Sequence, residues 1–189
     1  MAELRFLSQN KFKIRETERI LAPLGISIKP VEHRIEELQT EDTHALVRDK
    51  AIKAFSIVRR PLFVEHTGLY LEYLNGFPGG LTQIFWDRVQ ADKFAQLFGQ
   101  IPQRNGVLAK TVVGFVDGKT VRFFEGEIHG IIASEPRGNR SFQWDCIFVP
   151  DGYAQTFAEM EKEKDDISMR RKALDSFCQF LAAEGLCKS

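Results

Sequence analysis

The first third of the chain alternates short apolar segments with segments of helical spacing, and this alternation constrains the fold more than any other feature. Three segments, Leu4–Leu7, Ile26–Val31 and Pro61–Glu65, are predicted strands. Two longer segments, Asn10–Ala22 and Thr43–Val58, carry apolar residues at the spacing of one helix face. Strands that alternate with helices form a sheet covered by helices. The sequence therefore predicts the α/β fold class.

The remainder of the chain predicts antiparallel strands beside that first unit. Leu108–Val116 and Val121–Ile132 are joined by Asp117-Gly118, a dipeptide typical of a hairpin when it separates two apolar segments. Phe142–Phe148 is predicted to be one more strand. Further helices are predicted over Asp87–Phe98, Thr156–Lys162 and Ile167–Glu184. With 189 residues the chain can bury one sizeable core, so we expect a single domain over residues 1–189.

Charge and hydropathy exclude several classes of partner. The 26 basic and 26 acidic side chains cancel, so no overall field attracts nucleic acid or an anionic membrane, and neither is an expected partner. The chain opens on an apolar strand without the basic and then apolar segment of a secretion signal, and no apolar run reaches about 18 residues. We therefore expect a cytoplasmic protein whose partner is a small molecule or another protein.

Two ionisable side chains, Glu65 and His66, follow the apolar residues of the third predicted strand and precede the glycine-rich segment Asn75–Gly80. Active sites commonly lie where a strand meets such a loop. A carboxylate beside an imidazole can hold a metal ion or move a proton. The histidine can equally occupy a position that once held another acid. The residues alone leave both interpretations open.

A phosphate site is one interpretation of the first predicted turn from strand to helix. Ser8 and Asn10 stand at this turn, and Lys13 lies on the first turn of the helix. A helix N-terminus offers unpaired amide donors and a partial positive charge, to which a lysine adds its own. The simpler interpretation is that Ser8 or Asn10 caps the helix and that Lys13 is solvated. Taken alone, the residue types favour this simpler interpretation.

Acidic residues around the second predicted helix suggest a magnesium site. The segment Glu36–Asp42 precedes this helix, and Glu65 ends the next strand. Two carboxylates from separate loops suit magnesium, which takes its other ligands from water and from phosphate oxygens. A run of acids before a helix is more commonly a solvated surface that interacts favourably with the helix dipole.

A purine-binding site is suggested by the last third of the chain. Aromatic Phe142 and Trp144 are followed by Asp145, and Lys164 and Arg170 come later. Aromatic faces stack on a flat base, a carboxylate accepts from a ring N–H, and an arginine donates to a keto oxygen. Such a set distinguishes a 6-oxopurine from a 6-aminopurine. The alternative is an aromatic core beside a basic helix surface, and the residues alone do not separate the two.

Three motifs stand in a fixed order along the chain. The opening motif, Ser/Thr-x-Asn-x-x-Lys-x-x-Glu, is matched by Ser8, Asn10, Lys13 and Glu16. The second is Lys50-Ala51-x-x-Ala54, and the third runs from Trp144 to Ser168 and includes Thr-Phe-Ala-Glu-Met. Together these motifs span nearly the whole chain and resemble the inosine triphosphate pyrophosphatase family, whose members remove non-standard purine nucleoside triphosphates.

The resemblance implies a long mixed central sheet with flanking helices, two lobes with a nucleotide cleft between them, and usually a homodimer. It also implies hydrolysis of inosine or xanthosine triphosphate to the monophosphate and pyrophosphate, with magnesium as cofactor. Triphosphate binding is implied for Ser8, Asn10, Lys13 and Lys50, and metal binding for Glu37 and Glu65. Base and sugar binding is implied for Phe142, Trp144, Asp145, Lys164, Ser168, Met169 and Arg170.

The chain departs from the family pattern at two reactive positions. His66 stands where family enzymes carry a catalytic aspartate, and a neutral imidazole prefers zinc, copper or iron to magnesium. We therefore predict that His66 is an impaired catalytic residue, because the metal is weakened and the attacking water is poorly oriented. Met169 stands where the family has histidine and cannot donate to a keto oxygen, although Arg170 remains.

This selective loss of reactive groups favours binding without turnover. We therefore hypothesise a pseudoenzyme that senses dITP or ITP as a homodimer or in a hetero-complex with an effector protein, for example in bacterial antiviral defence. The alternative is an active magnesium-dependent pyrophosphatase that hydrolyses dITP, ITP or XTP. A structural subunit without nucleotide binding is a third hypothesis, which the retained Asn10, Lys13 and Arg170 disfavour.

Overall fold

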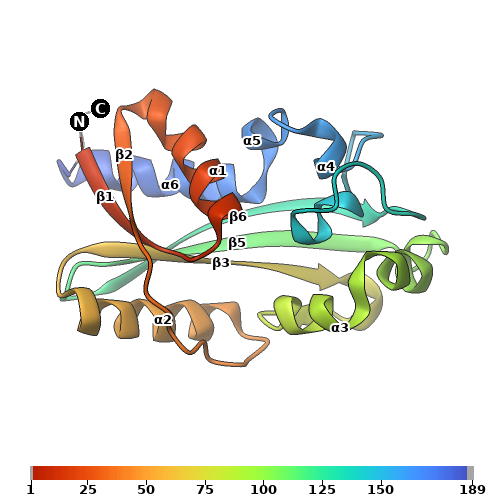
Figure 1. Cartoon of the computed structure of the whole chain (residues 1–189), viewed down its shortest axis with the longest axis horizontal. Helices are drawn as coiled ribbons and strands as arrows, with labels where there is room; N and C mark the ends of the chain where they lie inside the picture. Colours follow the sequence, from red (N-terminus) through yellow and green to blue (C-terminus); the bar gives the residue numbers. More distant parts are fainter. Residues whose placement is uncertain (1, 187–189) are drawn as a thin grey trace.

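A mixed sheet forms the centre of the protein (Figure 1). The computed structural model describes residues 2–186, whose seven strands are β1 (Ala2–Leu7), β2 (Ile26–Val31), β3 (Leu62–Leu71), β4 (Pro78–Gly79), β5 (Gly106–Val116), β6 (Val121–Ile132) and β7 (Phe148–Pro150). Their order is β2-β1-β3-β5-β6-β7, with β4 also paired to β3. β1 is parallel to both β2 and β3, and the other pairs are antiparallel. The predicted α/β class with a long mixed sheet is confirmed.

Helices cover both faces of this sheet. They are α1 (Lys11–Leu21), α2 (Thr43–Val58), α3 (Thr82–Phe94), α4 (Phe157–Met160), α5 (Lys164–Ile167) and α6 (Met169–Ala183). Shorter turns are η1 (Ala22–Leu24), η2 (Glu72–Leu74), η3 (Ala95–Gly99) and η4 (Gln143–Cys146). In Figure 1, α1, α4, α5 and α6 lie on one side of the sheet, and α2 and α3 lie on the other. None of the helices formed by residues 2–186 is long and apolar enough to cross a membrane.

Apolar side chains pack on both faces of the sheet. On one face, the rings of Phe6 and Phe63 stack with centroids 4.5 Å apart and pack with Phe177 of α6. On the other face, Leu46 and Val47 of α2 pack against β3 and β5. A third cluster joins the far end of the sheet to α3, η4 and α4. Because both faces are covered, β3 is apolar and buried along most of its length.

β3 is longer than the sequence predicts. The strand expected over Pro61–Glu65 begins at Leu62 and has 10 residues, because β5 pairs with it as far as Leu71 opposite Val107. The Glu65-His66 pair therefore lies within a strand and not at its end.

The edge of β3 that faces away from β5 is shared by two short neighbours. β1 meets this edge at Phe63, whereas β4 meets it at Leu69 and Tyr70. The stretch His66–Gly68 lies between these two contacts. The C-terminal end of β1 reaches the same gap, and the C-terminal ends of parallel strands are common ligand positions in α/β proteins. The gap thus places polar residues of β3 beside the turn that follows β1.

The strand predicted over Phe142–Phe148 is wrong over most of its length. Its residues form the turn η4, and only β7 beyond it is extended. Gln143 has a φ of 42°, in the left-handed region, and the amide of Asp145 donates to the carbonyl of Phe142 at 3.2 Å. These local bonds reverse the backbone, so that Trp144 and its neighbours enter one core together instead of alternating between two faces.

The bounds of three predicted helices also differ. The helix expected from Asp87 begins at Thr82, because the Thr82 hydroxyl accepts from the Leu69 amide and fixes the start of α3 against β3. The helix expected over Thr156–Lys162 is reduced to α4, which starts with a capping box completed by Glu159. The closing helix expected over Ile167–Glu184 is present as α6, which begins two residues later, after α5 has ended at Ile167.

Candidate functional site

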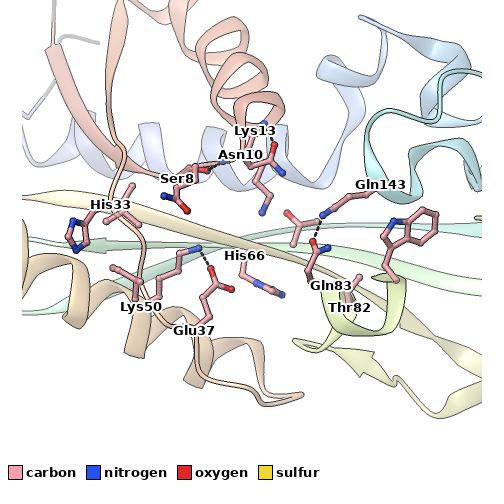
Figure 2. A pocket seen from close by; sticks show the side chains of 15 residues that line it. Ser8, Asn10, Lys13, His33, Glu37, Lys50, His66, Thr82, Gln83 and Gln143 are labelled. Carbon is pink, nitrogen blue, oxygen red and sulfur yellow. Dashed lines mark hydrogen bonds and ion pairs between the residues drawn. The ribbon is translucent and has the colours of Figure 1, made fainter. Parts of the chain in front are cut away.

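A cavity of about 230 Å³ opens beside the edge of β3, between the end of β1 and α3. We call it the polar cavity. Its walls come from the turn between β1 and α1, from segment 33–37, and from α2, β3, α3 and η4. The predicted site residues that line it are Ser8, Asn10, Lys13, Glu37, Lys50 and His66. Figure 2 shows these side chains entering one space from several elements.

The N-terminus of α1 forms one wall of the polar cavity. The Asn10 Oδ1 atom accepts from the backbone amides of Phe12 at 3.0 Å and Lys13 at 3.2 Å, so Asn10 caps the helix. The Ser8 hydroxyl in turn accepts from the Asn10 amide at 3.2 Å. The capping part of the simpler interpretation is therefore correct, whereas its solvated Lys13 is wrong, because that side chain is 16% exposed and paired with Glu65. The same cap directs the positive end of the helix dipole at the cavity, so capping and anion binding are compatible.

Two lysines add positive charge to the polar cavity. The Lys13 Nζ atom lies 3.0 Å from a carboxylate oxygen of Glu65. The Lys50 Nζ atom lies 2.6 Å from a carboxylate oxygen of Glu37 and 3.4 Å from the backbone carbonyl of Glu65. Burial lowers the pKa of Lys13, although the Glu65 carboxylate opposes this shift. Both ammonium groups are thus held in place by carboxylates that an incoming anion can replace.

His66 lines the same cavity and carries a buried, unpaired ring nitrogen. The residue is 6% exposed, and its Nε2 atom has no hydrogen-bond partner among residues 2–186. Burial, with Lys13 and Lys50, lowers the pKa of His66 to about 3. The imidazole is therefore neutral at pH 7, and a bound ligand or water molecule would provide the missing hydrogen bond.

Glu65 lies beneath the polar cavity and not in its wall. Its carboxylate accepts from Arg170 Nε at 2.7 Å and from Arg170 Nη2 at 3.2 Å, in addition to its contact with Lys13. Burial by itself raises the pKa of Glu65, but Arg170 and Lys13 outweigh burial and lower it. Glu65 is therefore ionised and already paired with two cations.

The predicted magnesium ligands do not by themselves fit a magnesium site. Glu65 is paired with two cations, and Glu37 is paired with Lys50. His66 offers a nitrogen atom, whereas magnesium prefers oxygen. Within residues 2–186, no group of three or more His, Cys, Asp or Glu residues could hold a metal ion. Magnesium binding at Glu37 and Glu65 therefore stays a proposal in which a bound nucleotide supplies further oxygens.

A second cavity, of about 350 Å³, borders another face of α1. We call it the aromatic cavity, and three predicted base-binding residues line it: Phe142, Asp145 and Lys164. Phe12 stacks on Phe142 with ring centroids 5.1 Å apart, and Phe157 forms a further wall. The Lys164 Nζ atom lies 4.5 Å from the centroid of the Phe142 ring and 2.7 Å from an Asp145 carboxylate oxygen. An aromatic face beside a carboxylate and an ammonium group suits a flat ring that carries N–H and keto groups.

The two cavities share two walls. From α1, Lys13 lines the polar cavity and Phe12 lines the aromatic cavity. At the start of η4, Gln143 lines the polar cavity and Phe142 lines the aromatic one. The Gln143 amide also donates to the side-chain oxygen of Gln83 on α3 (Figure 2). A ligand with an anionic chain at one end and a flat ring at the other therefore has adjoining sites for both.

Four residues predicted to bind base or sugar line neither cavity. Trp144 is 3% exposed and Met169 is 1% exposed, and both belong to the core next to the aromatic cavity. Ser168 caps α6 by accepting from the amide of Arg171 at 3.1 Å. Arg170 is 1% exposed and bonds to carboxylates between the cavities. In this structure these four side chains pack against, or bond to, neighbours of the cavity walls and line neither cavity.

Three residues of this region had no predicted role: Glu16, Gln83 and Gln143. Glu16 lies three residues after Lys13, and this spacing places both on one side of a helix, so the sequence does carry a signal for it. Gln83 and Gln143 are 60 residues apart and meet only through the fold. No local pattern indicates that pair.

Comparison of the sequence with known proteins gives a consistent result. Residues 4–180 match the sequence profile of the Ham1 family. A dITP/XTP pyrophosphatase from Hyperthermus butylicus is 34% identical over 177 residues, which cover 93% of each chain. A dITP/XTP pyrophosphatase from Methanopyrus kandleri is 36% identical over 178 residues, which cover 93% of this chain and 94% of the relative.

Comparison with solved structures gives the same fold. The structure of a HAM1 protein from Coxiella burnetii superposes with a TM-score of 0.78 at 24% identity, covering 97% of this chain and all of that one. A nucleoside-triphosphatase / dITP/XTP pyrophosphatase from Mycobacterium abscessus superposes with a TM-score of 0.70 at 25% identity, covering 95% and 99% of the two chains.

Proposed function

The chain belongs to the Ham1 family, and we propose that it binds purine nucleoside triphosphates of the dITP/XTP type and hydrolyses them to the monophosphate and pyrophosphate. The observation that carries the proposal is the polar cavity, where the N-terminus of a helix meets two lysines held in place by exchangeable carboxylates. The named activity of the relatives supports the same substrate class.

In this proposal the triphosphate occupies the polar cavity. Lys13 and Lys50 turn from Glu65 and Glu37 to the phosphate oxygens, and the N-terminus of α1 with Ser8 and Asn10 supplies hydrogen-bond donors. The three negative charges or more of a triphosphate compete well with a single carboxylate for an ammonium group. Glu37 and Glu65, once their lysines have turned away, would hold any magnesium ion, and the ion would supply positive charge beside the phosphate oxygens.

The purine occupies the aromatic cavity. Phe142 stacks on the base, the Asp145 carboxylate accepts from the N–H of a 6-oxopurine ring, and Lys164 donates to a keto oxygen. A 6-aminopurine lacks that ring N–H and presents an amino group, so two of these contacts are lost. The residues that line this cavity are supported by four buried neighbours that do not line it: Trp144, Ser168, Met169 and Arg170.

His66 limits the rate of hydrolysis. His66 lines the polar cavity, and its buried, unpaired Nε2 atom can accept a hydrogen bond or a proton from an attacking water molecule that reaches it. Since the pKa of His66 is lowered to about 3 by burial and by Lys13 and Lys50, the imidazole is a weak base at pH 7. Slow turnover is the expected consequence.

A second candidate function is a receptor that binds the same nucleotide without turnover. The specific observation in its favour is His66, a neutral side chain beside a Glu65 carboxylate that is already paired with Arg170 and Lys13. In this case binding of the nucleotide changes the activity of an effector protein. The receptor acts in the cytoplasm as a homodimer or in a hetero-complex with that effector, for example in antiviral defence.

A pyrophosphate-release assay separates the two functions. The protein is mixed with excess dITP and magnesium, and pyrophosphate is followed while bound nucleotide is recovered and identified. The enzyme releases more than one pyrophosphate per chain, and Lys13→Met reduces that release because a phosphate ligand is lost. Intact dITP on the protein with no release would identify the receptor instead. The absence of both pyrophosphate release and bound nucleotide would contradict both functions.

A further inference from the structure

Six ionisable side chains form a continuous row of ion pairs of alternating charge between the two cavities. In order they are Asp145, Lys164, Glu16, Arg170, Glu65 and Lys13, and we call this row the ion chain. The successive nitrogen-to-oxygen distances are 2.7, 3.3, 2.5, 2.7 and 3.0 Å. Lys13 is the most exposed side chain of the six, at 16%. The ion chain therefore connects α1, β3, η4, α5 and α6 through side chains that are largely buried.

The two ends of the ion chain reach different cavities. The aromatic cavity is lined by Asp145, Lys164 and Glu16, and the polar cavity is lined by Lys13. Between them, Arg170 and Glu65 line neither cavity. A ligand group that bonds to the ion chain in one cavity therefore changes the electrostatic environment of side chains that line the other cavity.

Each inner cation of the ion chain is shared between two carboxylates. The Lys164 Nζ atom contacts both Asp145 and Glu16. Arg170 bonds to Glu16 through Nη1 and to Glu65 through Nε. The partition of each cation between its two partners can therefore change without leaving any charge unpaired, which is the costly outcome for buried ions.

We propose that the ion chain couples the two cavities energetically, with Glu16 as the positioning residue that transmits the effect. This inference rests on the proposed function, in which a triphosphate enters the polar cavity and a purine enters the aromatic cavity. It predicts that each half of the nucleotide strengthens binding of the other half.

The sign of the coupling follows from the order of charges. A triphosphate that takes Lys13 leaves Glu65 to Arg170 alone, so Arg170 moves toward Glu65 and away from Glu16. Glu16 then attracts Lys164 more strongly and draws it from Asp145. The Asp145 carboxylate is thereby released to accept a hydrogen bond from the ring N–H of a base.

The electrostatics of the ion chain agree with this direction of response. Burial lowers the pKa of Lys13 and raises the pKa of Asp145, so the charged forms at the two ends are the least stabilised. In the middle, burial alone would raise the pKa of Glu16, but Arg170 and Lys164 outweigh it and lower that pKa. The middle of the ion chain therefore stays charged, whereas burial disfavours the charges at its two ends.

The coupling can be measured with the two halves of the nucleotide supplied separately. Tripolyphosphate is titrated calorimetrically into the whole protein, with and without saturating deoxyinosine. We expect deoxyinosine to tighten tripolyphosphate binding about tenfold, within the usual range of coupling between sites, and linkage requires the reciprocal titration to give the same factor. A factor of one in the wild-type protein would overturn the inference.

Glu16→Gln tests the route of the coupling. This variant keeps the shape of the side chain and removes its charge, so the factor should fall below about twofold. Asp175→Asn is a matched control, since it removes one carboxylate from the separate Arg171–Asp175 pair of α6, and it should keep the wild-type factor. Undiminished coupling in Glu16→Gln would overturn the assigned route.

The proposed function and the coupling fail in different ways. If intact dITP does not bind, the proposed function is wrong, and the inference falls with it. If dITP binds and the two halves bind without influence on each other, the coupling alone is wrong. Should Glu16→Gln not fold, the wild-type factor still decides, and Glu16→Asp, which keeps the charge on a shorter side chain, should give an intermediate factor.

Discussion

At the scale of single residues, His66 determines how the polar cavity behaves. A carboxylate at this position would add negative charge beside Glu37 and attract a metal ion, whereas the neutral imidazole leaves the cavity dominated by Lys13 and Lys50. The wild-type cavity is therefore suited to bind an anion directly, with little help from magnesium.

The substitution His66→Asp should make nucleotide binding depend on magnesium. In EDTA the new carboxylate repels the triphosphate, so the affinity for dITP should fall at least tenfold; with magnesium it should recover, and pyrophosphate release should rise at least tenfold. The wild-type affinity should change less than about threefold between the two conditions. Titrations and turnover assays with and without EDTA give these values.

A matched control is available at His33, which lines the same cavity. His33→Asp adds the same charge at another point of the wall, so it should weaken dITP binding in EDTA without any gain in turnover. If His66→Asp behaved as His33→Asp does, the special role of position 66 would be refuted.

The buried imidazole also predicts how stability depends on pH. The pKa of His66 is about 3 in the fold and about 6.5 in an unfolded chain, so between these values the unfolded state binds a proton that the folded state does not. The stability due to neutral His66 is present above about pH 6.5 and is lost as the pH falls, at up to about 1.4 kcal/mol per pH unit.

Urea unfolding between about pH 5 and 6.5 measures this effect. His66→Gln keeps a polar side chain that does not titrate. The free energy of unfolding of this variant should therefore fall less steeply with decreasing pH, and the difference in slope should correspond to the uptake of up to one proton on unfolding. Identical slopes in the wild type and His66→Gln would show that the imidazole is not held neutral in the fold.

Residue roles could be predicted from the sequence only where the residues lie close in a motif. The spacing of Ser8, Asn10 and Lys13 indicates a helix N-terminus that can bind an anion, and the structure has that geometry. The two bonds between Arg170 and Glu65 join residues 105 apart, and no local pattern specifies them. The pairing of Glu65 was therefore beyond prediction, although its burial beside cations changes its expected role.

At the scale of elements, β3 places the site because it has different neighbours along one edge. Gly68 lies in the gap between β1 and β4, where a Cβ atom would come 2.5 Å from the backbone carbonyl oxygen of Gly79. This close approach lets the Thr82 hydroxyl donate to that carbonyl at 2.6 Å and accept from the Leu69 amide at 2.8 Å. The position of α3 and of the cavity wall that it forms depends on this contact.

The substitution Gly68→Ala should displace β4 and the start of α3. Because the obstructing atom belongs to the backbone, we expect a loss of about 1–3 kcal/mol in the free energy of unfolding. The affinity for dITP should also fall, since Thr82 and Gln83 line the polar cavity. Urea unfolding and a dITP titration measure the two effects, and an unchanged stability would contradict the tight β3–β4 contact.

Elements with local signals were predicted correctly. The hairpin at Asp117-Gly118 is present, because the Asp117 carboxylate accepts from the amides of Lys119 and Thr120 and closes the turn within a few residues. The strand over Phe142–Phe148 was wrong because apolar composition does not distinguish an extended segment from a buried turn. The length of β3 depends on its pairing with β5, about 45 residues away, which the sequence does not display locally.

At the scale of the whole molecule, the net charge is zero, so the two lysines of the polar cavity attract an anion locally and not through an overall field. The order of motifs along the chain was sufficient to predict a mixed sheet, because ordered motifs over nearly the full length specify a fold. The site consists of two cavities joined by buried charges. This arrangement depends on contacts between α1 and α6, which lie near opposite ends of the chain. Sequence reasoning did not provide those contacts.

We infer above all that the two adjoining cavities together bind one purine nucleoside triphosphate of the dITP/XTP type. Calorimetric titration of dITP into the wild-type protein tests it most directly, with dATP titrated under the same conditions. We expect saturable binding of one dITP per chain, at least about tenfold tighter than that of dATP, because Asp145 and Lys164 favour a 6-oxopurine. Equal affinity for dITP and dATP, or no saturable binding of dITP, would contradict it.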